Sequence, residues 1–250
     1  MSTVNDLARE RLIFALDVGE GLEEALYWVD LLGDHVGLFK VGKESFVRYG
    51  TEIVRQIHAR GRKVFLDLKF HDIPNTVARA AEAAFALGVT MFNVHALGGR
   101  RMMVETVEEV QRLTDRYGNP RPIVLAVTVL TSLNDSDLKM MGFSRGTRET
   151  ALNLARLAQD AGVSGVVASA DDAGAIRKAC GSEFLIVTPG IRGAREVAGD
   201  DQKRIVAPCE AIKRGVDFLV VGRPIRQAAD PASEADEIAS EIVRGFSLRD

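Results

Sequence analysis

The sequence predicts a single (β/α)8 barrel with its active site at the C-terminal ends of the strands, on three observations. Eight short runs rich in Val, Ile, Leu and Phe recur along the chain, and most are apolar throughout, as parallel strands covered on both faces are. Longer segments with helical periodicity and charge separate these runs. Eight units in 250 residues give about 31 residues each, a normal size for one strand and one helix.

The expected strands are the apolar runs at residues 12–17, 36–41, 63–68, 89–95, 123–128, 163–169, 184–188 and 218–222. The expected helices include the amphipathic segments at residues 23–32, 44–60, 76–87, 102–117, 148–161 and 232–244. No Ser- or Pro-rich linker divides the chain, so we expect residues 1–250 to form one domain. An open doubly wound sheet is the alternative, because one sequence does not reveal the order of its strands.

The composition limits the classes of partner. The 32 basic and 35 acidic residues give a net charge of −3, so the surface as a whole has no general attraction for nucleic acid or anionic membranes. The two cysteines are too few for a disulfide scaffold and suit a reducing cytoplasm. The polar N-terminal segment and the lack of a long apolar stretch predict neither secretion nor membrane insertion.

Charged residues gather at the ends of the first three expected strands. Asp17 ends the first, Lys40 lies in the second, and Asp67, Lys69 and Asp72 follow one another at the end of the third. Asp67 and Lys69 are two positions apart, so a strand directs both side chains to the same face. A salt-bridged strand end is the structural alternative, and a metal site built from the three carboxylates is another. The two lysines disfavour a metal, because ammonium groups would occupy the space of a cation. We therefore expect a catalytic array and no metal.

The last two expected strands end in glycine and arginine. Gly190 and Arg192 follow the seventh, while Gly222 ends the eighth and Arg223 comes directly after it, at the places where barrels of this class most often bind phosphate. The glycines let backbone N–H groups approach an anion, and a guanidinium can bind two of its oxygens. The glycines could instead serve only turns and the arginines only helix caps. Two such pairs at the two expected ends favour a phosphate site.

Residues 65–76 closely resemble the signature of the orotidine 5′-monophosphate decarboxylase family, with the sequence FLDLKFHDIPNT. The resemblance extends along essentially the whole chain, through the motifs ALD at 15–17, KVGKE at 40–44, NVHA at 93–96, AVTVLTS at 126–132 and VGRP at 221–224. Their order and spacing are similar to those of the bacterial branch. The segment at residues 193–198 does not align with the family pattern.

The resemblance implies cofactor-independent decarboxylation of orotidine 5′-monophosphate to uridine 5′-monophosphate, in de novo pyrimidine biosynthesis. It implies that Lys69 is the proton donor and that Asp67 lies against the substrate carboxylate. The remaining implied roles are ribose binding by Asp17 and Lys40, pyrimidine recognition by Thr131 and Ser132, and phosphate binding by Arg192, Gln202, Gly222 and Arg223. The family also forms homodimers, which implies that Asp72, Ile73 and Thr76 enter the active site of the other subunit.

Two other functions remain open at the level of the sequence. A metal-dependent ketose- or gulonate-phosphate decarboxylase or aldolase of the same suprafamily shares the Asp-x-Lys-x-x-Asp pattern, but has Glu where this chain has Lys40. A phosphate-sugar binding barrel without catalysis would need neither Asp67 nor Lys69 as a buried charge.

Overall fold

The computed structural model describes residues 4–19, 21–191 and 206–249, and in them the eight expected strands form a closed parallel barrel. Each strand pairs with the next along the chain, and β1 pairs with β8, which excludes the open doubly wound sheet. The strands are β1 (Leu12–Ala15), β2 (Leu38–Gly42), β3 (Val64–Phe70), β4 (Met91–His95), β5 (Ile123–Val127), β6 (Gly165–Val167), β7 (Leu185–Pro189) and β8 (Phe218–Val221). The predicted (β/α)8, or TIM, barrel is confirmed.

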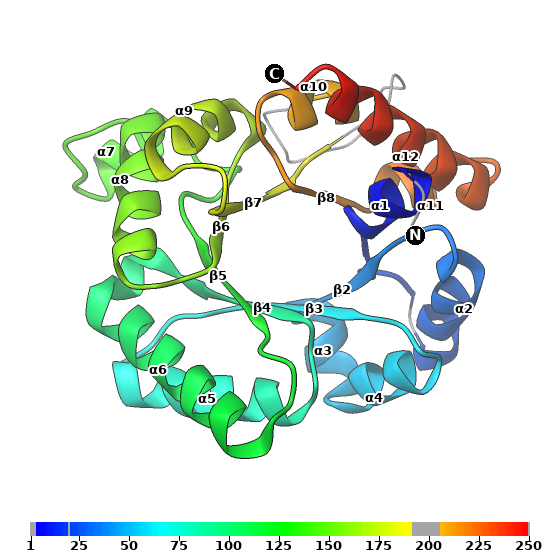
Figure 1. The fold of residues 1–250 in the computed structure, drawn as a ribbon, viewed down its shortest axis with the longest axis horizontal. Helices are drawn as coiled ribbons and strands as arrows, with labels where there is room; N and C mark the ends of the chain where they lie inside the picture. Colours follow the sequence, from blue (N-terminus) through cyan, green and yellow to red (C-terminus); the bar gives the residue numbers. More distant parts are fainter. Residues whose placement is uncertain (1–3, 20, 192–205, 250) are drawn as a thin grey trace.

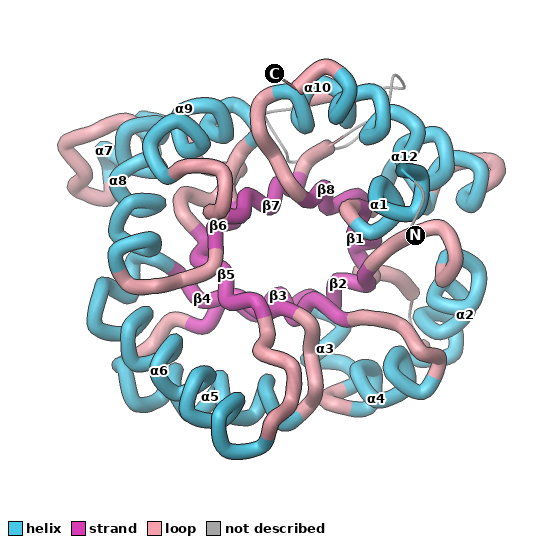
Figure 2. Tube along the Cα trace, in the orientation of Figure 1, coloured by secondary structure: helices cyan, strands magenta, loops and turns pink. Residues whose placement is uncertain are grey.

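The helices form a ring around the barrel (Figures 1 and 2). They are α1 (Val4–Glu10), α2 (Leu22–Leu32), α3 (Lys43–Tyr49), α4 (Glu52–Ala59), α5 (Pro74–Ala86), α6 (Gly99–Tyr117), α7 (Asp135–Met140), α8 (Thr147–Asp160), α9 (Ala170–Cys180), α10 (Pro208–Lys213), α11 (Arg223–Arg226) and α12 (Pro231–Ser247). One 3₁₀ turn, η1 (Ala96–Gly98), follows β4. Within the described residues, no helix is both long and apolar enough to cross a membrane.

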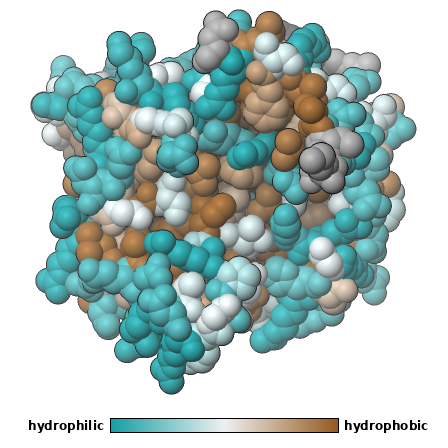
Figure 3. Space-filling model, viewed as in Figure 1, coloured by the Kyte–Doolittle hydropathy of each residue, from teal (hydrophilic) through white to brown (hydrophobic). Residues whose placement is uncertain are grey.

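Two hydrophobic cores follow from the alternation of side chains along the strands. Ile13, Phe65 and Leu125 belong to a small cluster inside the barrel, whereas Leu12 and Phe14 belong to the large cluster between the strands and the helices. The strands are therefore buried on both faces, which explains why their sequences are continuously apolar. Over the helical ring the surface is mostly hydrophilic, and hydrophobic residues gather toward the middle of the face seen in Figure 3.

The helix expected over residues 44–60 is two helices in the structure. Gly50 ends α3 with φ +59°, a backbone conformation that side chains disfavour, and α4 begins at Glu52. The break lets the chain change direction between α3 and α4, while α3 itself starts directly at the end of β2. This placement brings the first turn of α3 to the rim of the barrel.

Candidate active site

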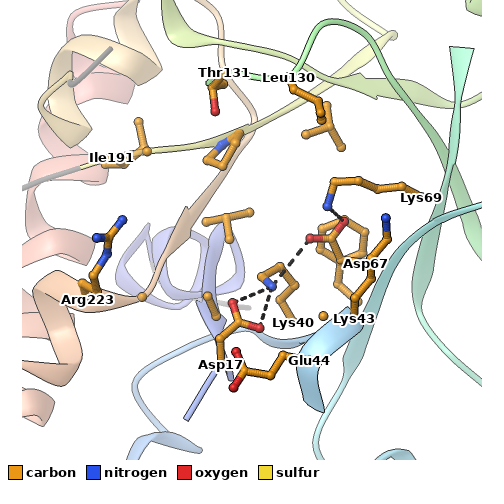
Figure 4. Close-up of a pocket in the computed structure, with 18 of the residues that line it drawn as sticks. Asp17, Lys40, Lys43, Glu44, Asp67, Lys69, Leu130, Thr131, Ile191 and Arg223 are labelled. Carbon is orange, nitrogen blue, oxygen red and sulfur yellow. Dashed lines mark hydrogen bonds and ion pairs between the residues drawn. The ribbon is translucent and has the colours of Figure 1, made fainter. Parts of the chain in front are cut away.

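A cavity of about 710 Å³ is lined by residues of every strand or strand end except β4, and most of them lie at the C-terminal ends (Figure 4). Its charged lining consists of five basic and three acidic side chains, namely Lys40, Lys43, Lys69, Arg223, Arg226, Asp17, Glu44 and Asp67. The whole chain carries a net charge of −3. The excess of cations in the cavity is therefore local, and it favours an anionic ligand there.

Asp67 and Lys69 meet at the end of β3. Lys69 Nζ lies 2.6 Å from Asp67 Oδ1, and the side chain of Asp67 is 14% exposed. Lys69 has φ +53°, and among the described residues it is the only non-glycine with a positive φ. The register of β3 against β4 also shifts between Leu66 and Phe70. A left-handed lysine costs about 1–2 kcal/mol, so the surrounding structure holds a strained residue at the cavity wall.

Asn93 of β4 holds this strained segment in place, although sequence reasoning assigned it no role. Its side chain is fully buried. Its Nδ2 donates to Asp67 Oδ1 at 2.7 Å, and its Oδ1 accepts from the backbone N–H of Lys69 at 2.7 Å. The amide of Asn93 thus fixes both the carboxylate of Asp67 and the backbone of Lys69. The available signal was a polar residue between the apolar residues Phe92 and Val94 of β4.

Lys40 links Asp67 to the loop after β1. Its Nζ lies 2.9 Å from Asp17 Oδ2 and 3.6 Å from Asp67 Oδ2, and its side chain is only 10% exposed. Ser45 of α3 supports the loop, since its hydroxyl donates to the carbonyl of Leu16 at 2.5 Å. Asp17, Lys40, Asp67 and Lys69 therefore form a continuous row of alternating charges. A buried ion is stabilised only when partners of this kind surround it.

The opposite wall of the cavity contains Gly190, Gly222 and Arg223. Figure 4 places Arg223 across the open space from Lys69, with Asp17 and Lys40 between them on one side and Thr131 on the other. Gly222 packs closely on Ala15, because a Cβ at Gly222 would lie 3.1 Å from the Cβ of Ala15. Arg192 and Gln202 lie outside the described residues.

Four expected site residues do not line this cavity. Ser132 is exposed, unlike Thr131, which lines it. Asp72, Ile73 and Thr76 are also exposed, and the Oδ1 of Asp72 accepts from the backbone N–H of Ile73 at 2.6 Å. The expectation that Asp72 shares one barrel mouth with Lys40, Asp67 and Lys69 is therefore not met within one chain. After Lys69 the chain turns away from the cavity and enters α5 at Pro74.

His95 ends β4 next to the site but does not line the cavity. Burial, together with repulsion from His71, Lys69 and Lys43, lowers the pKa of His95 from 6.5 to about 4. Its ring stacks on that of His71, with 5.3 Å between the centroids. The backbone N–H of Leu97 donates to its Nδ1 at 3.3 Å. His95 is therefore neutral at pH 7 and carries its proton on Nε2.

The described part of the chain has no group of three or more His, Cys, Asp or Glu side chains arranged to hold a metal ion. The oxygens of Asp17 and Asp67 instead face the ammonium groups of Lys40 and Lys69. Fixed ammonium and carboxylate groups are therefore the charged groups that these contacts bring together at the site.

Comparison with known proteins gives consistent results. Residues 10–238 match the model of the "Orotidine 5'-phosphate decarboxylase / HUMPS family". The chain is 61% identical, over 98% of both sequences, to an orotidine 5′-phosphate decarboxylase of Syntrophus aciditrophicus, and 52% identical to that of Geotalea daltonii over 96% of this chain and 99% of the relative. The crystal structure of orotidine 5′-phosphate decarboxylase from Lactobacillus acidophilus superposes with a TM-score of 0.81 at 37% identity, over 92% of this chain and 98% of that one.

Proposed function

Because the chain belongs to the orotidine 5′-phosphate decarboxylase / HUMPS family, we propose that it converts orotidine 5′-monophosphate to uridine 5′-monophosphate and carbon dioxide in pyrimidine biosynthesis. The observation that carries this proposal is the ammonium of Lys69, held 2.6 Å from Asp67 at the wall of a cavity with excess positive charge. Cys180 and Cys209 are both free thiols, which suits a reducing compartment, and we place the reaction in the cytoplasm.

The arrangement of the cavity supports one orientation of the substrate. The phosphate lies at Arg223 and the backbone of Gly222, with Arg192 and Gln202 proposed to contribute from outside the described residues. We propose that the ribose hydroxyls bind the Asp17–Lys40 pair and that the pyrimidine lies between Thr131 and Lys69, whose positions Figure 4 shows. Ser132 is the second proposed contact to the pyrimidine. This orientation directs C6 of the base toward Lys69.

In this orientation the C6–carboxyl bond breaks and its electron pair stays on C6, while carbon dioxide leaves. No carbonyl group delocalises that pair, so the positive charge of Lys69 stabilises the carbanion directly. The ammonium then transfers a proton to C6. Asp67 positions the ammonium, and its own negative charge opposes the carboxylate of the bound substrate. Contacts to the phosphate, far from C6, also stabilise the transition state, because they hold the substrate in the orientation that places C6 at Lys69.

The same contacts disfavour the two alternatives. A metal-dependent sugar-phosphate decarboxylase or aldolase needs free carboxylates, whereas Lys40 contacts both Asp17 and Asp67. A purely binding barrel needs no strained lysine, yet Lys69 is held at φ +53°. Strain of this kind is concentrated at functional sites.

We also propose that the active unit is a homodimer with shared sites. Asp72, Ile73 and Thr76 are exposed at the rim of the barrel, and the side chain of Ile73 is 66% exposed. Leu97, which follows β4 on the neighbouring η1 turn, is 46% exposed. A second copy that covers these apolar side chains would bring Asp72 to the partner's Lys69.

The proposed activity is tested by following the absorbance of orotidine 5′-monophosphate with protein treated with a chelator. We expect full activity without added metal. Activity that requires Mg²⁺ contradicts the proposal and favours the metal-dependent alternative.

A variant of the proposed proton donor tests the mechanism. Lys69→Ala is expected to remain folded and to lose at least roughly a thousandfold in kcat, because both the cation and the proton are removed. The matched control is Lys63→Ala, which removes an exposed lysine just before the same strand. Near-normal turnover by folded Lys69→Ala excludes the mechanism.

A further inference from the structure

Arg226 connects the two ends of the cavity. It is the last residue of α11, the four-residue helix that begins at Arg223, and it lines the cavity. Its backbone N–H donates to the carbonyl of Gly222 at 3.0 Å. Its side-chain Nη1 donates to the backbone carbonyl of Asp17 at 2.7 Å. One residue thus joins the backbone at the phosphate end to the backbone that carries the ribose-binding carboxylate.

Asp17 depends on its surroundings for its position, because it lies two residues beyond the end of β1. The carbonyl of Leu16 accepts from Ser45, and the carboxylate of Asp17 contacts Lys40. The bond from Arg226 fixes the backbone carbonyl of Asp17 itself. With the carbonyl and the carboxylate both held, the direction in which Asp17 faces the cavity is set.

We infer that Arg226 is a positioning residue for substrate binding, which acts on the ribose through Asp17 and couples that contact to the phosphate end at Gly222 and Arg223. This inference rests on the proposed function, and it assigns a role to a residue outside the proposed substrate contacts. A hydrogen bond from a charged group to a carbonyl is stronger than a neutral one, so its loss is measurable.

The test compares Arg226→Met, which keeps an apolar side chain but removes the donor, with Arg226→Lys, which keeps a cationic donor. The readouts are the Kd for uridine 5′-monophosphate by calorimetry, kcat and KM for orotidine 5′-monophosphate, and Tm. We expect Arg226→Met to weaken binding and kcat/KM by roughly ten- to a hundredfold, mostly through KM. Arg226→Lys is expected to restore part of the loss.

The matched control is Arg62→Met. Arg62 Nη1 also donates to a backbone carbonyl, that of Gly33 at 2.8 Å, but Arg62 does not line the cavity. We expect this variant to bind and turn over like the wild type. A decrease in Tm of the same size in both variants, with binding weakened only in Arg226→Met, separates positioning from stability.

A double-mutant cycle with Asp17→Ala shows whether Arg226 acts on ligand binding through Asp17 or by direct contact with the ligand. If Arg226 acts through Asp17, Arg226→Met costs less than about threefold in Kd in the Asp17→Ala background. A full loss in that background shows direct contact with the ligand and overturns the inference, as does a variant that binds normally or does not fold. If the wild type binds and shows this coupling but does not turn over orotidine 5′-monophosphate, the proposed function fails and the inference stands.

Discussion

At the scale of single residues, the carboxylate of Asp67 is the centre of the charged row in the cavity. It lies near Lys69 Nζ, Asn93 Nδ2 and Lys40 Nζ at 2.6, 2.7 and 3.6 Å. Removing a single partner from a buried ion leaves an uncompensated charge, so these contacts stabilise one another. The strain of the left-handed Lys69 is tolerated because the same network holds its backbone.

Gly42 gives the first prediction at this scale. Its φ of −86° suits any residue, but a Cβ there would lie 2.7 Å from Asp17 Oδ1 and 2.8 Å from Lys40 Nζ. Gly42→Ala is therefore expected to separate this ion pair and to raise KM about tenfold or more, with little change in Tm. Steady-state kinetics and thermal melting measure both quantities.

Gly21→Ala is the matched control for this variant. Gly21 is also the residue before a helix, and a Cβ added there meets nothing within 4 Å. Kinetics that are equally changed in both variants, or unchanged in Gly42→Ala, contradict the steric explanation.

His95 gives a prediction about pH. The folded chain lowers the pKa of His95 from 6.5 to about 4, so between these values the unfolded chain binds more protons at this position. The stabilisation that His95 contributes to the folded state is therefore fully present above pH 6.5, and it is lost as the pH decreases toward 4. His95→Gln is expected to flatten the dependence of Tm on pH in this window. An equally steep decrease in the variant shows that other groups cause it.

At the scale of elements, Arg177 of α9 joins α9, β7 and β8. Its guanidinium donates to the carbonyls of Gly181, Phe184 and Gly215 and to Asp217 Oδ2 at 2.5 Å. Asp217 is 9% exposed, and its Oδ2 also accepts from the backbone N–H of Ile186. These contacts hold the starts of the two strands whose other ends form the proposed phosphate site.

Arg177→Met is expected to lower the free energy of unfolding by about 3–5 kcal/mol, because among the described residues it leaves buried Asp217 with only the more distant Arg249, at 3.5 Å, as a cationic partner. Arg177→Met protein that remains folded is expected to have the kcat of the wild type. Urea unfolding measures the change. Arg112→Met is the control, since Arg112 pairs with Glu109 on the surface of α6 with its side chain 48% exposed, and loss of an exposed ion pair is expected to change the free energy of unfolding little.

The elements differ in how well the sequence predicts them. All eight strands were predicted, because burial on both faces makes each one a continuous apolar run. The break at Gly50 was missed, because the helical periodicity of α4 continues that of α3. Although a helical segment was expected between each pair of strands, no bounds were predicted for the helix α9. Its residues are mostly small or polar, and its start depends on the hydroxyl of Ser169, which accepts from the N–H of Asp171.

At the scale of the whole molecule, closure of the barrel explains which site residues could be predicted. Strand ends converge in any closed barrel, so Asp17, Lys40, Asp67 and Lys69 could be placed together from their positions alone. The contributions of Asn93 and Arg226 depend on side-chain contacts between distant segments, 24 residues apart from Asn93 to Lys69 and 209 from Arg226 to Asp17. Such contacts leave no pattern along one sequence.

The placement of Asp72 outside its own cavity leads to a prediction about the assembly. In a homodimer with shared sites, a Lys69→Ala chain still supplies Asp72 to its partner, and an Asp72→Ala chain still supplies Lys69. Each variant alone is expected to be inactive. When the two are mixed and allowed to exchange subunits, half of the dimers are hybrids with one intact site, so roughly a quarter of wild-type activity returns.

The control mixture combines Lys69→Ala with Asp67→Ala, two residues that contact each other within one chain. Every site in that mixture lacks one of them, so no activity returns. Equal recovery in both mixtures, or none in the first after exchange has been demonstrated by mass spectrometry, contradicts a shared site and leaves Asp72 as a residue of the rim.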